Sequence, residues 1–171
     1  YSVCPELGIA HGNRLRCLNA MPGHPNVIEP GKRPRITLTP TLIGRDGRVI
    51  GAISVAGGDL QDQTTLTCLL NWLEFGMPPE QAVTAPRFST GHHENSFSPE
   101  ADRQSAIVGR SVLSVDPVLQ GPVTTALAAK GHNVILADKP IGNPVMLCLD
   151  PETGLMQAAG DPKAGRHAGA L

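Results

Sequence analysis

Two adjacent glycines separate a strand-like segment from a helix-like segment near the middle of this sequence. The run Val49–Ala56 is continuously apolar, as expected of a strand that is buried on both faces. From Leu60 to about Phe75 the period changes, and apolar residues recur at helical spacing at Leu66, Leu69, Leu70, Leu73 and Met77. Gly57 and Gly58 lie between the two segments, where the absence of side chains would let another group approach the main chain closely.

Signals on both sides of this junction predict a mixed fold. Asp-Gly in Arg45-Asp46-Gly47, between two apolar runs, predicts a β-hairpin. Further elements are predicted as a helix over Glu80–Thr84, a loop over 89–104, a helix over Asp116–Lys130 and strands in NVILA, PVMLCLD and LMQAAG. Strands grouped at both ends with helices between them indicate the α+β class, with helices packed on a largely antiparallel sheet in a single domain over residues 1–171. If helices cover only one face, another sheet or chain must cover the other.

Composition excludes several classes of partner. The 171 residues are 40% apolar and 17% charged, with a formal net charge of −1. This balance gives no electrostatic reason to expect binding to nucleic acid or to an anionic membrane surface. The sequence also has no run of about 18 apolar residues of the kind that spans a membrane.

The four cysteines are scattered along the chain, at Cys4, Cys17, Cys68 and Cys148. They have neither zinc-type spacing nor the density of a disulfide scaffold, so we expect reduced thiols, which favour the cytoplasm slightly. The start of the sequence has no initiator Met and no signal-peptide pattern. We therefore expect the chain to be a piece of something longer.

The glycines at the strand–helix junction have three possible roles. A helix N-terminus exposes unpaired N–H groups and a partial positive charge, which suit a phosphate or the oxyanion of an acyl-transfer intermediate. Neither of the usual glycine-rich phosphate-binding motifs is present around Gly57 and Gly58, which weakens the phosphate hypothesis. The third possibility is a tight turn with no ligand.

Five segments in a fixed order resemble the γ-glutamyltranspeptidase family. They are PGKRPRITLTPT at 30–41, AGGDLQDQTTL at 56–66, NWLEFGMPPEQAVTAPRF at 71–88, KGHNV at 130–134 and AAGDPKAGRHAGAL at 158–171. Each segment is weak alone, but their order and spacing together are specific.

This resemblance implies an N-terminal-nucleophile hydrolase, with the αββα sandwich of that class. Such a proenzyme cuts itself, and the new N-terminal threonine of its small subunit attacks an amide with its own α-amine as the base. Gly57 and Gly58 match the glycines that supply the oxyanion hole in that family. The resemblance further implies that the chain is the C-terminal part of a small subunit, that its nucleophile lies before Tyr1, that a large subunit is its partner, and that the chain alone is inactive.

The substrate-binding segments depart from the γ-glutamyl pattern. Of the family's Ser/Thr pair only Thr37 remains, because Ile36 stands at the other position. In CLNAMPGHPN, Ala20 and Gly23 stand where the family has the Gln and Asp that bind the substrate's α-amine. An ammonium without its carboxylate partner loses about 1.5–3 kcal/mol. We therefore favour a small-molecule amide or acyl substrate without that amine, as in oxamate hydrolases and cephalosporin acylases, over γ-glutamyl transfer or hydrolysis proper.

Two further charged residues are candidates for substrate binding. Arg33 is a candidate partner for a substrate carboxylate, and Asp59 a candidate substrate contact beside the helix N-terminus. His92-His93-Glu94 lacks the spacing of a metal site, so neither metal nor cofactor is expected. A non-catalytic interaction domain is an alternative function. Association into a homo-oligomer is expected because a truncated chain would leave the strand Val49–Ala56 without a neighbour.

Overall fold

The computed structural model describes residues 2–10, 12–98, 100, 102, 104–107 and 109–169. The chain divides into two compact units. The first comprises Tyr1–Ile36 and Glu94–Ile107, and the second comprises Thr37–His93 and Val108–Leu171. The single domain over residues 1–171 stays a prediction.

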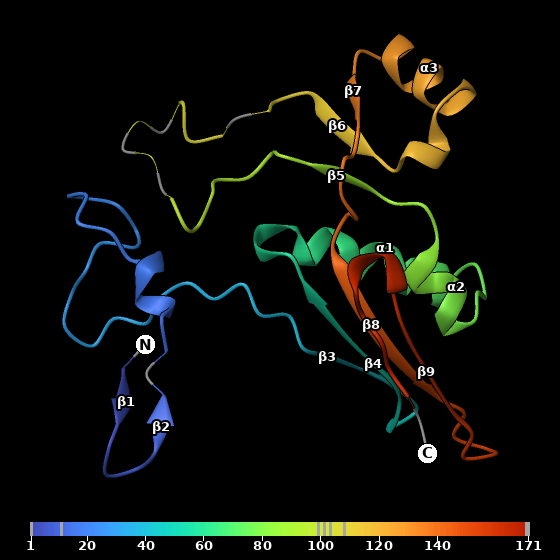
Figure 1. The fold of residues 1–171 in the computed structure, drawn as a ribbon, viewed down its shortest axis with the longest axis horizontal. Coiled ribbons are helices and arrows are strands. Elements are labelled where there is room, and N and C mark those ends of the chain that lie inside the picture. Colours follow the sequence, from blue (N-terminus) through green and yellow to red (C-terminus); the bar gives the residue numbers. More distant parts are fainter. Residues whose placement is uncertain are drawn as a thin grey trace. The chain divides into compact units, whose positions relative to one another are not determined.

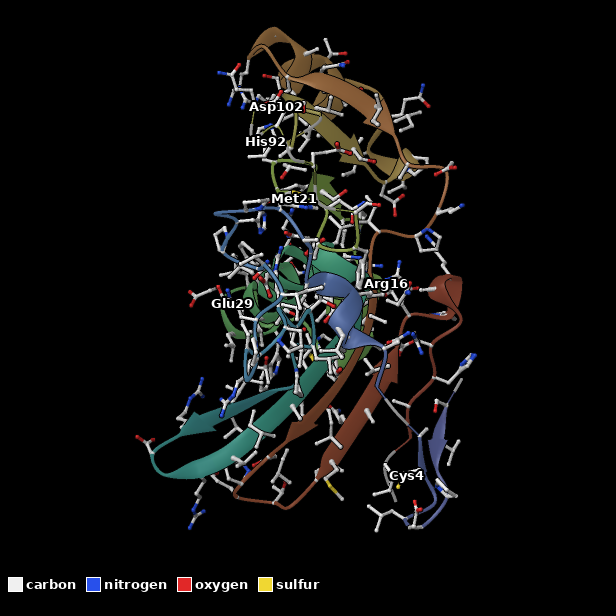
Figure 2. The ribbon with its side chains drawn as sticks, turned by 90° about the vertical axis from the view of Figure 1, so that its left-hand side faces the viewer. Cys4, Arg16, Met21, Glu29, His92 and Asp102 are labelled. Atoms are coloured by element: carbon white, nitrogen blue, oxygen red, sulfur yellow. The ribbon has the colours of Figure 1, made fainter. Side chains whose placement is uncertain are left out.

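The first unit has little regular structure. The strands β1 (Val3–Cys4) and β2 (Ile9–Ala10) pair in antiparallel fashion, and a short 3-10 helix, η1, covers Arg14–Cys17. Figure 2 labels Cys4 on this hairpin and Arg16 on η1. The guanidinium of Arg16 lies 5.0 Å from the ring centroid of Phe97, so a cation–π contact joins the two chain segments of the unit.

The second unit is built on a four-stranded antiparallel sheet in the order β3-β4-β8-β9 (Figure 1). The strands are β3 (Thr41–Arg45), β4 (Arg48–Ala56), β8 (Asn143–Leu149) and β9 (Met156–Gly160). Asp46 and Gly47 join β3 to β4 with φ of 51° and 75°, the left-handed values of a type I′ turn. The hairpin predicted at Arg45-Asp46-Gly47 is confirmed.

Two helices cover one face of this sheet, α1 (Gln61–Leu73) and α2 (Pro79–Thr84). Between them and the strands lies the core, formed by Ile53, Val55, Cys68, Ala82, Val83, Met146, Cys148 and Ala159. Gly51 in β4 is required for this packing, because a Cβ there would lie 2.7 Å from Cη2 of Trp72. The antiparallel sheet with packed helices confirms the predicted α+β class.

One expectation about β4 is wrong, and burial of its second face by another sheet or chain stays a prediction. Burial alternates from Gly51 to Val55, since Ile53 and Val55 are buried while Ser54 between them is exposed. Within the described residues it is therefore buried on one face, and the continuous apolar run in the sequence did not reveal which residues face the helices. The strand also has neighbours on both sides, β3 and β8, so it is not the strand left without a neighbour.

The packed face of α1 also differs from the predicted one. Gln61, Thr64, Thr65 and Cys68 are its buried residues, whereas Leu66 and Leu70 are exposed. Of the predicted apolar positions, Leu69 and Met77 pack against the core. Close approach of the helix to the sheet favours the smaller side chains on the buried face.

A second, three-stranded sheet belongs to the same unit. It contains β5 (Phe88–Thr90), β6 (Val112–Val115) and β7 (Asn133–Leu136), with β5 antiparallel and β7 parallel to β6. The predicted helix Asp116–Lys130 is wrong at its start, since a 3-10 helix η3 (Pro117–Leu119) precedes α3 (Pro122–Ala129). Gly121, with φ of 118°, interrupts the two segments, and Pro122 takes the first helical position, where its missing N–H costs nothing.

Among the residues described, none of the helices has both the length and the apolar character that a membrane crossing requires.

Candidate active site

The two glycines lie where β4 ends and the helical segment begins. Gly57 has φ of 156° and Gly58 has φ of 61°, both values that residues with side chains rarely adopt. A 3-10 turn, η2 (Gly58–Leu60), follows and leads directly into α1. Glycine at both positions therefore allows the abrupt change from strand to helix.

Neither glycine at this junction is buried. Gly57 is exposed and Gly58 is partly exposed. Their carbonyl groups accept bonds from the N–H groups of Leu60, at 3.2 Å, and Gln61. In the described part of the chain, neither glycine N–H donates to a main-chain carbonyl. We call Gly57 and Gly58 with their two N–H groups the amide cradle; its role in binding an oxyanion stays a prediction.

The amide cradle lies at the positive end of a 13-residue helix. Side-chain hydrogen bonds hold this end in place. Thr39 Oγ1 donates to Gln61 Oε1 at 3.1 Å, Gln63 Nε2 donates to the carbonyl of Thr90 at 3.1 Å, and the N–H of Thr90 donates to Gln63 Oε1 at 2.9 Å. Neither glutamine was predicted from the sequence, because their partners are 22 and 27 residues away along the chain.

Gly142, just before β8, packs behind the amide cradle. A Cβ on Gly57 would lie 3.6 Å from Cα of Gly142. A Cβ on Gly142 would in turn lie 2.9 Å from Cβ of Thr64, which is 2% exposed. Gly142 therefore fits between α1 and the cradle only because it lacks a side chain. The Thr64 hydroxyl has no hydrogen-bond partner among the described groups.

The other predicted site residues fall in both units. Thr37 is buried and Asp59 is partly buried, and both belong to the second unit with the cradle. Ile36, at the other position of the Ser/Thr pair, is 56% exposed. Arg33 is exposed in the first unit. The substrate-binding roles of Thr37, Asp59 and Arg33 stay predictions.

A buried ion pair joins the segment after α2 to the segment after β9. Arg87 and Asp161 are 5% and 1% exposed, and Arg87 Nη2 donates to Asp161 Oδ2. Arg87 follows α2, and Asp161 caps the 3-10 helix η4 (Pro162–Ala164) through a bond from the N–H of Lys163 at 3.0 Å. No local sequence pattern pairs Arg87 with Asp161, because the two residues are 74 positions apart.

The described histidines and cysteines form neither a metal-ligand cluster nor a disulfide. His92 Nε2 accepts a bond from the N–H of Ser111 at 2.6 Å, and the described residues contain no group of three metal-ligand side chains. Cys68 and Cys148 are buried and, like Cys4 and Cys17, free, as predicted. Burial raises the pKa of each of the two thiols to about 11, so both are protonated near neutral pH and are poor nucleophiles.

Comparison with known proteins gives the family context of this site. The family model described as gamma-glutamyltranspeptidase matches residues 2–171. The glutathione hydrolase proenzyme of Bacillus subtilis (strain 168) is 29% identical over 159 residues, covering 93% of this chain and 24% of that protein. The oxamate amidohydrolase proenzyme of Klebsiella pneumoniae is 30% identical over 170 residues, covering 95% and 29%. The chain thus spans about a quarter of the length of these relatives.

Solved structures show the same fold. A gamma-glutamyltranspeptidase from Pseudomonas nitroreducens, complexed with L-DON, superposes with a TM-score of 0.73 at 24% identity, covering 99% of this chain and 85% of that one. This likeness establishes the arrangement of the elements, while the residues that act in catalysis require a separate argument.

Proposed function

Because the chain belongs to the gamma-glutamyltranspeptidase family, we propose that it forms part of an amide hydrolase in which Gly57 and Gly58 are the oxyanion hole. The nucleophile is a threonine in a segment outside the present sequence. The observation that carries the proposal is the amide cradle, two consecutive N–H groups without main-chain acceptors in the described part of the chain, at the positive end of α1.

The proposed reaction has two steps. The threonine oxygen attacks the amide carbon while its proton passes to the α-amine, and the carbonyl oxygen becomes an oxyanion that accepts bonds from Gly57 and Gly58. The C–N bond then breaks, and the leaving amine takes the proton. Water attacks the acyl-enzyme in the same way, which releases the acid and restores the threonine. Each oxyanion donor is worth about 3 kcal/mol of transition-state stabilisation.

The substrate is an amide whose acyl part lacks an α-amine. Residues 17–26, CLNAMPGHPN, contain no acid that could bind an ammonium. The Asn19 side chain is already engaged, since its Oδ1 accepts from the N–H of Met21 at 3.0 Å and its Nδ2 donates to His24 Nδ1 at 2.9 Å. The alternative is a γ-glutamyl hydrolase or transferase; relatives named for glutathione and for oxamate have nearly equal identities to this chain.

Two substrates that differ only in the α-amine test this proposal. We expect the complete processed enzyme to hydrolyse glutaryl-p-nitroanilide with a kcat/KM about 10-fold or more above that of γ-glutamyl-p-nitroanilide, because the ammonium lacks a partner. Release of p-nitroaniline measures both rates. A preference for the γ-glutamyl compound would contradict the substrate assignment. Hydrolysis of neither compound, nor of oxamate, would favour a non-catalytic interaction domain.

The face of the four-stranded sheet opposite α1 and α2 is the proposed contact with the large subunit. Leu42, Ala52, Leu147 and Ala158 are register partners across the four strands, on the face opposite the helices. They line an apolar hollow of about 440 Å³. A second sheet on this face would complete the αββα sandwich. Ala52→Glu should prevent assembly of the two subunits in co-purification; normal assembly would contradict the contact.

Homo-oligomer formation stays a proposal, which light scattering of the complete protein tests.

A further inference from the structure

Arg87 uses three of its nitrogen atoms to bind three different segments. Its Nε donates to the carbonyl of Ile141 at 2.8 Å, its Nη1 to the carbonyl of Val83 and its Nη2 to Asp161. These acceptors lie in the segment before β8, in α2 and after β9. One buried side chain therefore fixes the relative positions of three segments that are distant in sequence.

Asp161 orients Arg87 and is itself held on several sides. Its Oδ1 accepts from the N–H of Lys163 at 3.0 Å, and its own N–H donates to the carbonyl of Pro144 at 3.2 Å. Its carbonyl accepts from Ala164 and Arg166. Main-chain hydrogen bonds therefore hold the Asp161 carboxylate in place independently of its bond to the guanidinium. The charged pair is consequently rigid.

Ile141 and Gly142 connect the charged pair to the amide cradle. Arg87 binds the carbonyl of Ile141, and the next residue, Gly142, packs between Gly57 and Thr64. A shift of Ile141 would move Gly142 and would change the surface against which Gly57 rests. Interiors are close-packed, so such a displacement is transmitted to neighbouring atoms.

We propose that Arg87 and Asp161 are positioning residues that set the geometry of the amide cradle through Ile141 and Gly142. The effect expected on kcat rests on the proposed function. Neither residue touches the reacting atoms in the proposal; they hold the main chain on which the two N–H donors depend.

The geometry requires arginine in particular. A lysine at position 87 would keep the positive charge, but its single nitrogen cannot reproduce the fixed fork of guanidinium donors. Arg87→Lys therefore preserves charge and approximate size while releasing one or more of the three acceptors. Asp161→Asn preserves shape and removes the charge. Arg48→Lys is the matched control, since Arg48 also donates to a main-chain carbonyl, that of Pro151 at 3.3 Å, but at the exposed opposite end of the sheet.

The test uses the complete processed enzyme and glutaryl-p-nitroanilide. We expect Arg87→Lys and Asp161→Asn to lower kcat of the folded fraction about 10- to 100-fold with little change in KM, because misplaced donors weaken transition-state stabilisation. Arg48→Lys should leave both constants unchanged. In addition, the ¹H–¹⁵N signals of Gly57 and Gly58 should shift in both pair variants and not in the control.

The outcomes separate positioning from simple structural support. Loss of stability with normal kcat in the folded fraction and unshifted glycine signals would overturn the proposal. If Arg87→Lys yields no folded protein, Asp161→Glu, which keeps the charge, is measured in its place and should give a smaller decrease in kcat with shifted glycine signals; unshifted signals and normal kcat there would equally overturn it. Failure of the proposed function is recognised separately, because the glycine signals report on position without any turnover.

Discussion

At one end of the four-stranded sheet the chain turns in exposed loops, whereas the other end has two consecutive glycines and a buried charged pair. The exposed end contains the turn at Asp46-Gly47 and the loop between β8 and β9, where Asp150 Oδ1 accepts from the N–H of Glu152 at 2.9 Å. Turn residues there bond to near neighbours in sequence, and the long-range bond from Arg48 to the carbonyl of Pro151 is exposed rather than buried. At the cradle end, Arg87 and Asp161 meet across 74 positions.

This difference indicates where function constrains the fold. Local turns are sufficient to connect antiparallel strands, as the exposed end demonstrates. The cradle end has long-range hydrogen bonds and two N–H groups without main-chain acceptors in the described residues. Such groups cost stability unless a ligand or water accepts from them.

The largest effect is expected from breaking the buried pair. Asp161→Ala leaves the Arg87 charge without its carboxylate partner, so we expect the free energy of unfolding to fall by about 3–5 kcal/mol. At the exposed end, Arg48→Ala should change it by less than about 0.5 kcal/mol. Denaturant titration of the complete protein measures both values. Equal losses at the two ends would show that the ends do not differ.

A smaller effect on stability, with a distinct effect on activity, is expected from two glycines of similar backbone geometry. Gly58 and Gly47 have φ of 61° and 75°. Alanine at either position should cost about 1 kcal/mol of stability. Only Gly58→Ala should also lower kcat, by about 10- to 100-fold, since it disturbs an oxyanion donor. An unchanged kcat in Gly58→Ala would contradict the role of the cradle.

The smallest effect concerns two buried thiols. For Cys68, burial is the main cause of the raised pKa, Arg87 opposes it and Asp161 adds to it; for Cys148 burial alone acts. Asp161→Asn should therefore lower the pKa of Cys68 below about 11 and leave that of Cys148 unchanged, as ¹³Cβ shifts during titration would show. A parallel change in both thiols would point to general loosening.

The raised pKa of Cys68 also determines the direction in which stability changes with pH. The folded pKa of Cys68 is about 11, above its ordinary value of 9.0. The folded state therefore binds the proton more tightly than the unfolded state. Its contribution to stability is fully present below pH 9.0 and is lost as the pH rises through about 11.

Local signals explain which parts of the fold the sequence could predict. The Asp46-Gly47 turn, the strand–glycine–helix junction and the C-terminal strands depend on neighbouring residues, and the structure contains all of them. The three-residue strand β5 and the break at Gly121 were missed, because short strands have weak patterns and the apolar content of 116–130 resembles one helix. The partners of Gln61, Gln63 and Arg87 are set by tertiary structure, which no local pattern reveals.

The most direct test is a crystal structure of the complete enzyme with a boronic acid substrate analogue bound covalently to the nucleophile. Its tetrahedral adduct places an oxygen where the oxyanion forms. We predict that this oxygen lies about 2.7–3.1 Å from the main-chain nitrogens of both Gly57 and Gly58. An oxygen bound by other donors, with both glycine N–H groups directed to carbonyls of their own fold, would contradict the account.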